Sequence, residues 1–140
     1  MLPNKSILAL DVGDVRVGVA LARPESGLAQ PHKILLNDDM LIRNIQEIIS
    51  EFNVGVLVVG LPRNLDGQDT AQTKKVRMFT ESLKTQITAT IHCQDEALSS
   101  VRAREAIALG NSAGEKVDID AMAASYILDD YLNERKIAKK

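Results

Sequence analysis

The chain is poor in cysteine, which cross-links many small domains, and in aromatic residues, which form flat binding surfaces. Its 140 residues include a single cysteine, Cys93, and no tryptophan, and aromatic residues make up only 3% of the sequence. One cysteine excludes an internal disulfide framework, and so few rings exclude an extended platform for stacking single-stranded bases. The core must therefore be aliphatic, drawn from the hydrophobic residues that make up 45% of the chain.

Long hydrophobic runs and an excess of positive charge are also missing. Asp, Lys or Arg interrupts every apolar segment before it reaches the roughly 20 residues needed to cross a bilayer. The first five residues, MLPNK, lack the apolar stretch of a secretory signal. We therefore expect a cytoplasmic protein with no membrane partner. The net charge of −2 gives no overall attraction to a polyanion, so nucleic-acid binding would have to rely on local patches or bound cations.

The hydrophobic pattern predicts one domain over residues 1–140. Three short strands, with Pro31 confining the third to a sheet edge or entry position, are followed by a nearly continuous apolar strand that is expected to be covered on both faces. The order of elements predicts an α/β fold, a mixed five-stranded sheet of three antiparallel strands and then parallel strands, flanked by helices. The expected strands are 7–10, 17–20, 30–36, 54–59 and 87–93; the expected helices are 40–49, 70–83, 99–110 and one from about 118, with a frayed tail at 136–140.

Asp11 stands where the first strand enters a tight turn. Within the hairpin, Gly13 is expected to tolerate the turn dihedrals, and Gly18 to leave room for another backbone or a ligand. A carboxylate held at the rim of a sheet by two strands can bind a metal ion or a metal-bound phosphate. A polar residue in an ordinary turn is the alternative. Farther along, Asp38 or Asp39 is expected to cap the first helix.

Other acidic residues stand at element ends that the fold would bring to the same edge. Glu96 follows Asp95 at the end of the last strand, and Asp118 and Asp120 open the last helix. Ligands of α/β sheets gather outside the carboxyl ends of the strands, so Asp11 and Glu96 are expected to be neighbours. If the last helix packs across that edge through its small Ala residues, it brings Asp120 to them. Clustered carboxylates repel one another unless a cation is present, and Mg²⁺ prefers oxygen ligands. The alternatives are a helix cap for Asp118, which is the preferred interpretation there, stabilisation of the same first turn by Asp120, and a solvated loop at 95–96.

Three further polar residues are candidates for binding a phosphate backbone. Arg63 and Asn64 follow the fourth strand in a loop rich in Gly, Pro and Asn, where a guanidinium and amides could hold a phosphate. Arg16 lies in the first hairpin. An ordinary turn for the loop and a solvated charge for Arg16 are the alternatives.

Taken together, these segments resemble the YqgF/RuvX family of RNase H-like nucleases, also described as Holliday junction resolvases or pre-16S rRNA nucleases. The resemblance implies an RNase H-like fold, a Mg²⁺ or Mn²⁺ cofactor, and catalytic and metal-binding roles for Asp11, Glu96 and Asp120. Two departures from the family pattern, Asp14-Val15 and Ala97, remove positive charge from the expected substrate path. The matching segments are 11–13 with 16–20, 58–67, 95–96 with 98–100, and 120–124 with 127–128.

The leading hypothesis is a metal-dependent endonuclease, a hydrolase of the two-metal-ion type, that processes the 5′ end of pre-16S rRNA in ribosome biogenesis. A Holliday junction resolvase in DNA recombination and repair, or a non-catalytic RNA- or ribosome-binding module of the same fold, are alternatives. A sugar kinase or actin-like ATPase would need a second lobe, for which 140 residues leave no room. The expected partners are structured or precursor ribosomal RNA or branched DNA, and ribosomal particles. A monomer or weak homodimer is expected, while the choice of RNA or DNA and the cleavage position stay open.

Overall fold

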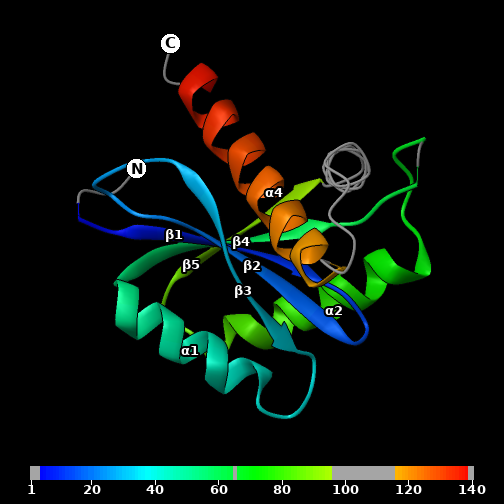
Figure 1. Cartoon of the computed structure of the whole chain (residues 1–140). Coiled ribbons are helices and arrows are strands. Elements are labelled where there is room, and N and C mark those ends of the chain that lie inside the picture. Colours follow the sequence, from blue (N-terminus) through cyan, green and yellow to red (C-terminus); the bar gives the residue numbers. More distant parts are fainter. Residues whose placement is uncertain (1–3, 65, 96–115, 139–140) are drawn as a thin grey trace.

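The computed structural model describes residues 4–64, 66–95 and 116–138 as a mixed α/β domain (Figure 1). The strands form one sheet of five in the order β3-β2-β1-β4-β5. β1 pairs antiparallel with β2 and β2 antiparallel with β3, whereas β4 runs parallel to both β1 and β5. The predicted fold class is therefore confirmed, including the edge position of the strand that contains Pro31. The elements are β1 (Ser6–Val12), β2 (Arg16–Ala22), β3 (Ala29–Leu36), α1 (Leu41–Phe52), β4 (Val54–Leu61), α2 (Ala71–Lys84), β5 (Thr90–Asp95) and α4 (Lys116–Ala138).

The helices cover the sheet in two layers, with α1 and α2 on one face and α4 on the other (Figure 1). Alternation along β1 divides its side chains between the two layers, because successive residues of a strand point to opposite faces. Leu8 and Leu10 pack with α1 and α2, while Ile7 and Ala9 pack under α4. Each large aliphatic side chain buried in this way stabilises the fold by about 1.5–3 kcal/mol.

The side of the sheet under α4 is lined largely by small residues. Ala9, Ala20 and Ala22 present methyl groups to the helix, which packs on them through Ala124, Ile127, Leu128 and Tyr131. Small side chains on both partners let the helix axis approach the sheet closely. The inward-facing residues predicted for this helix are all buried, as expected.

The starts of α1 and β5 depart from the sequence-based predictions. α1 has Met40 as its N-cap, with no side-chain cap, because the Asp38 carboxylate accepts the Met40 amide at 2.9 Å in the turn before the helix. The prediction of an Asp38 or Asp39 cap was therefore wrong. β5 begins at Thr90 rather than at 87, because the amide of Ile87 still donates to Leu83 of α2 at 3.0 Å. The predicted helix over 99–110 lies outside the described residues.

The last helix is longer than predicted at both ends. α4 begins at Lys116 and continues to Ala138, through part of the segment expected to fray. Two contacts anchor its C-terminal half to the sheet. The Gln94 side-chain amide of β5 donates to the Glu134 carboxylate at 3.1 Å, and the Tyr131 side chain is buried between the helix and the sheet. None of the helices in the described part of the chain is long and apolar enough to cross a membrane.

His32 makes the stability of the fold depend on pH. Its ring packs edge-on against Phe52 with centroids 5.0 Å apart. Burial, followed by the positive charges of Lys33 and Arg23, lowers the pKa of His32 below its ordinary 6.5, with Glu51 acting in the opposite direction. The unfolded chain therefore takes up the proton first as pH falls, so this contribution is present above pH 6.5 and is lost on acidification below it.

We expect the melting temperature of the parent to fall more between pH 7.5 and 5.5 than that of His32→Gln. The two proteins should change in parallel between pH 7.5 and 8.5, where His32 is neutral in both states. Thermal unfolding followed by circular dichroism at several pH values measures the difference. An equal acid-side slope in parent and variant would contradict the assignment.

Candidate active site

The candidate site lies at the carboxyl end of β1, on the side of the sheet that α4 covers. Asp11 alternates in register with Ile7 and Ala9, which places it on this face, and it is half-buried. Its partner across the antiparallel pair is Gly18 of β2. Opposite residues of such a pair lie about 4.5–5.5 Å apart, so whatever lies above Gly18 lies beside Asp11.

The backbone of α4 is what lies above Gly18. A Cβ atom built on Gly18 would come within 1.9 Å of the Asp120 carbonyl oxygen and 2.9 Å of the Ala121 amide nitrogen. The sequence-based prediction that Gly18 leaves room for another backbone is therefore confirmed. The close approach brings Asp120, which stands far from Asp11 in the chain, to the same end of the sheet.

Asp120 forms an ion pair with Arg16 of β2. The Arg16 Nε donates to the Asp120 Oδ2 at 3.1 Å, between residues 104 positions apart in the chain. The Asp120 side chain is 28% exposed and that of Arg16 is 48% exposed. A half-exposed pair of this kind contributes little to stability. Its chemical significance is that the carboxylate beside Asp11 already has a positive charge next to it.

The third predicted carboxylate, Glu96, lies outside the described residues, as does Ala97. Asp118 lies in the first turn of α4, with its backbone alone described. Within residues 4–64, 66–95 and 119–135, no three His, Cys, Asp or Glu side chains are grouped closely enough to hold a metal ion. The donor set that is described, the carboxylates of Asp11 and Asp120, is the oxygen chemistry that Mg²⁺ and Mn²⁺ prefer, so the residues fit a hard divalent cation.

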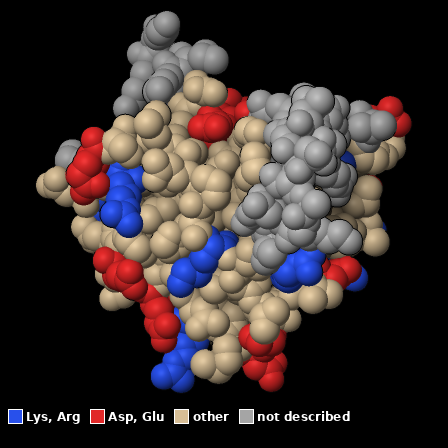
Figure 2. All heavy atoms as spheres, viewed as in Figure 1, with Lys and Arg blue, Asp and Glu red and all other residues tan. Residues whose placement is uncertain are grey.

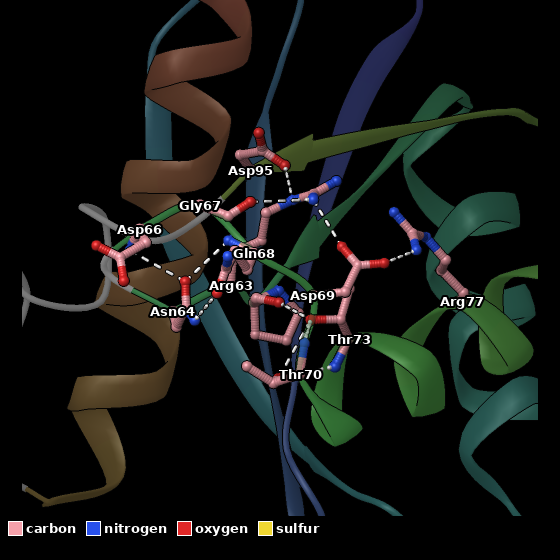
Figure 3. Close-up of polar contacts among 11 residues, drawn as sticks. Arg63, Asn64, Asp66, Gly67, Gln68, Asp69, Thr70, Thr73, Arg77 and Asp95 are labelled. Atoms are coloured by element: carbon pink, nitrogen blue, oxygen red, sulfur yellow. Dashed lines mark hydrogen bonds and ion pairs between the residues drawn. The ribbon is translucent and has the colours of Figure 1, made fainter.

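Arg63 and Asn64 are held in a compact loop after β4 (Figure 3). The Arg63 guanidinium donates through Nε to Asp95 at 2.8 Å and through Nη1 to Asp69 at 2.6 Å. Arg77 of α2 also pairs with Asp69. The positive charge of Arg63 is thus compensated by two carboxylates, one of which ends β5. The sequence did not single out Asp69; an isolated antiparallel bridge between positions 63 and 69 brings the two together.

The Asn64 side chain organises the turn itself. Its Oδ1 accepts the amides of Asp66 at 3.0 Å and Gln68 at 2.8 Å. Gly67 completes the turn with φ +78°, a conformation that glycine adopts without strain. At the other end of the loop, Thr70 and Thr73 form a reciprocal capping box that starts α2. The loop therefore has the internal bonding of an ordered turn, as the alternative interpretation expected.

The tip of the β1–β2 hairpin is constrained sterically. Gly13 has no positive φ, which corrects the expectation that it serves the turn dihedrals; a Cβ there would come within 2.7 Å of the Arg16 carbonyl oxygen. Asp14, one of the departures from the family pattern, lies 3.6 Å from the Lys75 ammonium of α2. The extra negative charge is thus offset in part by a neighbouring cation.

Charges of both signs are interspersed over the face of the molecule shown in Figure 2. Lys and Arg side chains stand beside Asp and Glu, and among the residues coloured by charge in this view neither sign forms a broad region. This mixture agrees with the net charge of −2. A polyanion approaching this face would meet local cations rather than a basic field, and a bound divalent ion would add strongly to the attraction.

The fold of this chain is shared with RuvC and with a viral Holliday junction resolvase. RuvC of Thermus thermophilus superposes with a TM-score of 0.55 at 9% identity, covering 92% of this chain and 96% of that one. The Holliday junction resolvase of fowlpox virus gives a TM-score of 0.57 at 11% identity, covering 92% and 99% of the two chains. At identities this low, the superpositions establish the shared fold alone.

Sequence comparison identifies the family. The family model described as "RuvX: Holliday junction resolvase" matches residues 5–134. A relative from Maridesulfovibrio salexigens, named "Putative pre-16S rRNA nuclease", is 37% identical over 90% of this chain and 96% of its own length. A relative of the same name from Orientia tsutsugamushi is 36% identical over 97% of this chain and 88% of its own. The chain belongs to the RuvX family, and the predicted resemblance is confirmed.

Proposed function

We propose that this protein is a divalent-metal-dependent endonuclease that hydrolyses phosphodiester bonds in the 5′ precursor segment of 16S rRNA. The observation that carries the proposal is the close contact of α4 with Gly18, which brings Asp120 to the end of β1 beside Asp11. Asp11 and Asp120 come from remote parts of the chain and together offer the carboxylate oxygens that a hard divalent cation prefers. The names of the relatives favour precursor rRNA as the substrate, and such a substrate assigns the protein to the cytoplasm.

In this proposal Asp11, Asp120 and Glu96 hold the metal ions. Mg²⁺ or Mn²⁺ ions held there, two of them in the mechanism we propose, would supply Lewis acidity and lower the pKa of an attacking water. Arg16 compensates the charge of Asp120, and it would contact the phosphate backbone once Asp120 has a metal ion as its partner. Arg63 and Asn64 would orient the backbone from the loop beside β5, with Asp69 and Asp95 fixing the Arg63 guanidinium.

Resolution of Holliday junctions is the second candidate. It is favoured by the family description and by the fold that the chain shares with RuvC and the fowlpox virus resolvase. The two activities require the same hydrolytic chemistry and differ in the shape of the nucleic acid. A non-catalytic RNA- or ribosome-binding module of this fold would keep the binding surface and lack the cleavage. Association with ribosomal particles and a monomeric or weakly dimeric state are further parts of the proposal.

The test is cleavage by the purified protein of precursor 16S rRNA and of a four-way DNA junction, side by side. We expect the rRNA to be cut within its 5′ precursor segment when Mn²⁺ or Mg²⁺ is added and to stay intact in EDTA. Cleavage of the junction alone would favour the resolvase. Binding of RNA without cleavage under any metal condition would overturn the nuclease proposal in favour of the binding module.

A further inference from the structure

A small cavity lies beside the β1–β2 hairpin, across the sheet from Asp11. Its volume is about 220 Å³, and its lining comes from the end of β1, the hairpin tip, the loop after β3 and α2. Val12 contributes a buried apolar side chain and Phe79 a half-buried ring, while Asp14, Asn37 and Lys75 are exposed. Polar and apolar groups therefore share the lining about equally, so a ligand could both pack in it and be oriented by hydrogen bonds.

Two amide side chains in the lining are oriented by the hairpin. The Asn37 Nδ2 donates to the Gly13 carbonyl at 2.6 Å, and the Gln72 Nε2 donates to the Val12 carbonyl at 3.3 Å. A backbone carbonyl only accepts, so the nitrogen of each amide must face the hairpin and the oxygen must point elsewhere. Across the described ranges, neither amide oxygen accepts a hydrogen bond from another residue. Two fixed acceptors are therefore available to a ligand that brings donors.

The charges at the opening favour an uncharged ligand. Asp14 and Lys75 stand 3.6 Å apart and both are about two-thirds exposed. A phosphate drawn to the Lys75 ammonium would meet the Asp14 carboxylate at the same place. A neutral, planar molecule with donors along one edge and acceptors along another would instead use both charges and could lie against the Phe79 ring.

We propose that this cavity binds one unstacked guanine base of the substrate RNA, an inference that rests on the proposed nuclease function. Guanine presents the N1 and N2 hydrogens as adjacent donors, which suit the Asp14 carboxylate and the amide oxygens, and O6 and N7 as acceptors for Lys75. The other bases present fewer donors. At about 30 Å³ per water, the cavity holds roughly seven waters, enough for a single base but not for a base pair. One aromatic ring suffices for one splayed base.

The position of the cavity places this guanine close to the candidate site of cleavage. Gly13 of the lining is two residues from Asp11, which corresponds to about 6.6 Å along an extended chain. Asp11 and Val12 face opposite sides of the sheet. A single strand crossing the end of β1 would thus reach both, with the bound base about one or two nucleotides from the phosphate at Asp11. The cavity would read the sequence beside the cut.

The test measures binding in EDTA, where no cleavage occurs. Three fluorescein-labelled RNA hexamers, hexauridylate and its two variants with adenosine or guanosine at the third position, are titrated with protein and followed by fluorescence anisotropy. We expect the guanosine oligonucleotide to bind at least about fivefold more tightly than the other two. Asn37→Leu and Gln72→Met, which keep side-chain size and remove the acceptor, should erase this preference. Asn133→Leu makes the same change at an exposed position of α4 and should keep the preference.

Equal binding of the three oligonucleotides, or a guanosine preference that survives both variants, would overturn the cavity proposal. If an amide variant does not fold, Lys75→Gln at an exposed helix position should reduce the same preference. If the protein cleaves precursor rRNA but binds the three oligonucleotides equally, the guanine-site proposal is wrong and the nuclease proposal stands. No binding of any oligonucleotide and no cleavage would overturn both.

Discussion

Replacing Asp11 by Asn is expected to lower the rate of metal-dependent cleavage by at least about 10²-fold, the typical cost of removing one electrostatic stabiliser from a hydrolytic site. The substitution keeps the size of the side chain and removes the charge that would hold a divalent cation. Because Asp11 is half-buried at the end of β1, rather than within either core cluster, the fold should be retained. Single-turnover cleavage of precursor rRNA in Mn²⁺ measures the rate, and thermal unfolding verifies the fold.

The matched control for this substitution is Asp39→Asn, which removes one carboxylate from an exposed turn before α1. It changes the net charge equally, so it reports any general electrostatic effect on RNA binding. We expect it to cleave at the parental rate. An Asp11→Asn protein that cuts as fast as the parent would remove Asp11 from the site, and a matching loss in Asp39→Asn would trace the effect to net charge.

Gly18→Ala is expected to disturb both stability and the site. Its Cβ would lie 1.9 Å from the Asp120 carbonyl oxygen, and the obstacle is helix backbone, which cannot rotate away. α4 would have to shift off the sheet, which would loosen the packing of its Ile127 and Leu128 side chains against the strands. Overpacking of this kind costs about 1–3 kcal/mol or more, which for a domain of this size lowers Tm by on the order of 10 °C. The shift would also move Asp120 away from Asp11, so cleavage should fall as well.

Gly27→Ala is the control, because it also adds a methyl group to a glycine. At Gly27 no atom lies within 4 Å of the added Cβ, and the cost comes from its φ of +66°, about 1–2 kcal/mol. We expect this variant to be less destabilised than Gly18→Ala and to cleave normally. Full cleavage and an unchanged Tm in Gly18→Ala would show that α4 is not seated on β2 as described.

The surroundings of Asp14, a departure from the family pattern, could not be predicted from the sequence. In the sequence it is an extra acid near the expected substrate path. In the structure the Lys75 ammonium lies 3.6 Å from its carboxylate, and both residues border a cavity that no sequence pattern indicated. The cavity arises from segments around positions 12, 37 and 72, and its lining residues share no spacing that periodicity could reveal.

The sequence by itself determined the elements of the described ranges and their order, because strand and helix periodicities are local properties of neighbouring residues. The continuous apolar run at 54–59 and the stripe at 123–131 predicted an interior strand and the buried face of the last helix, and both are as expected. The end points of helices and strands were less predictable where a tertiary contact sets them. The hydrogen bond from Gln94 to Glu134, which anchors the C-terminal part of α4, is an example.

The candidate site depended on contacts that no local pattern contains. The sequence singled out Gly18, Arg16 and Asp120 separately. Only the tertiary structure decided that the backbone of α4 rests on Gly18 and that Arg16 pairs with Asp120 across 104 positions of the chain. Strand register and the seating of a helix on a sheet are set by packing between remote segments, since small residues on both surfaces determine how closely they approach.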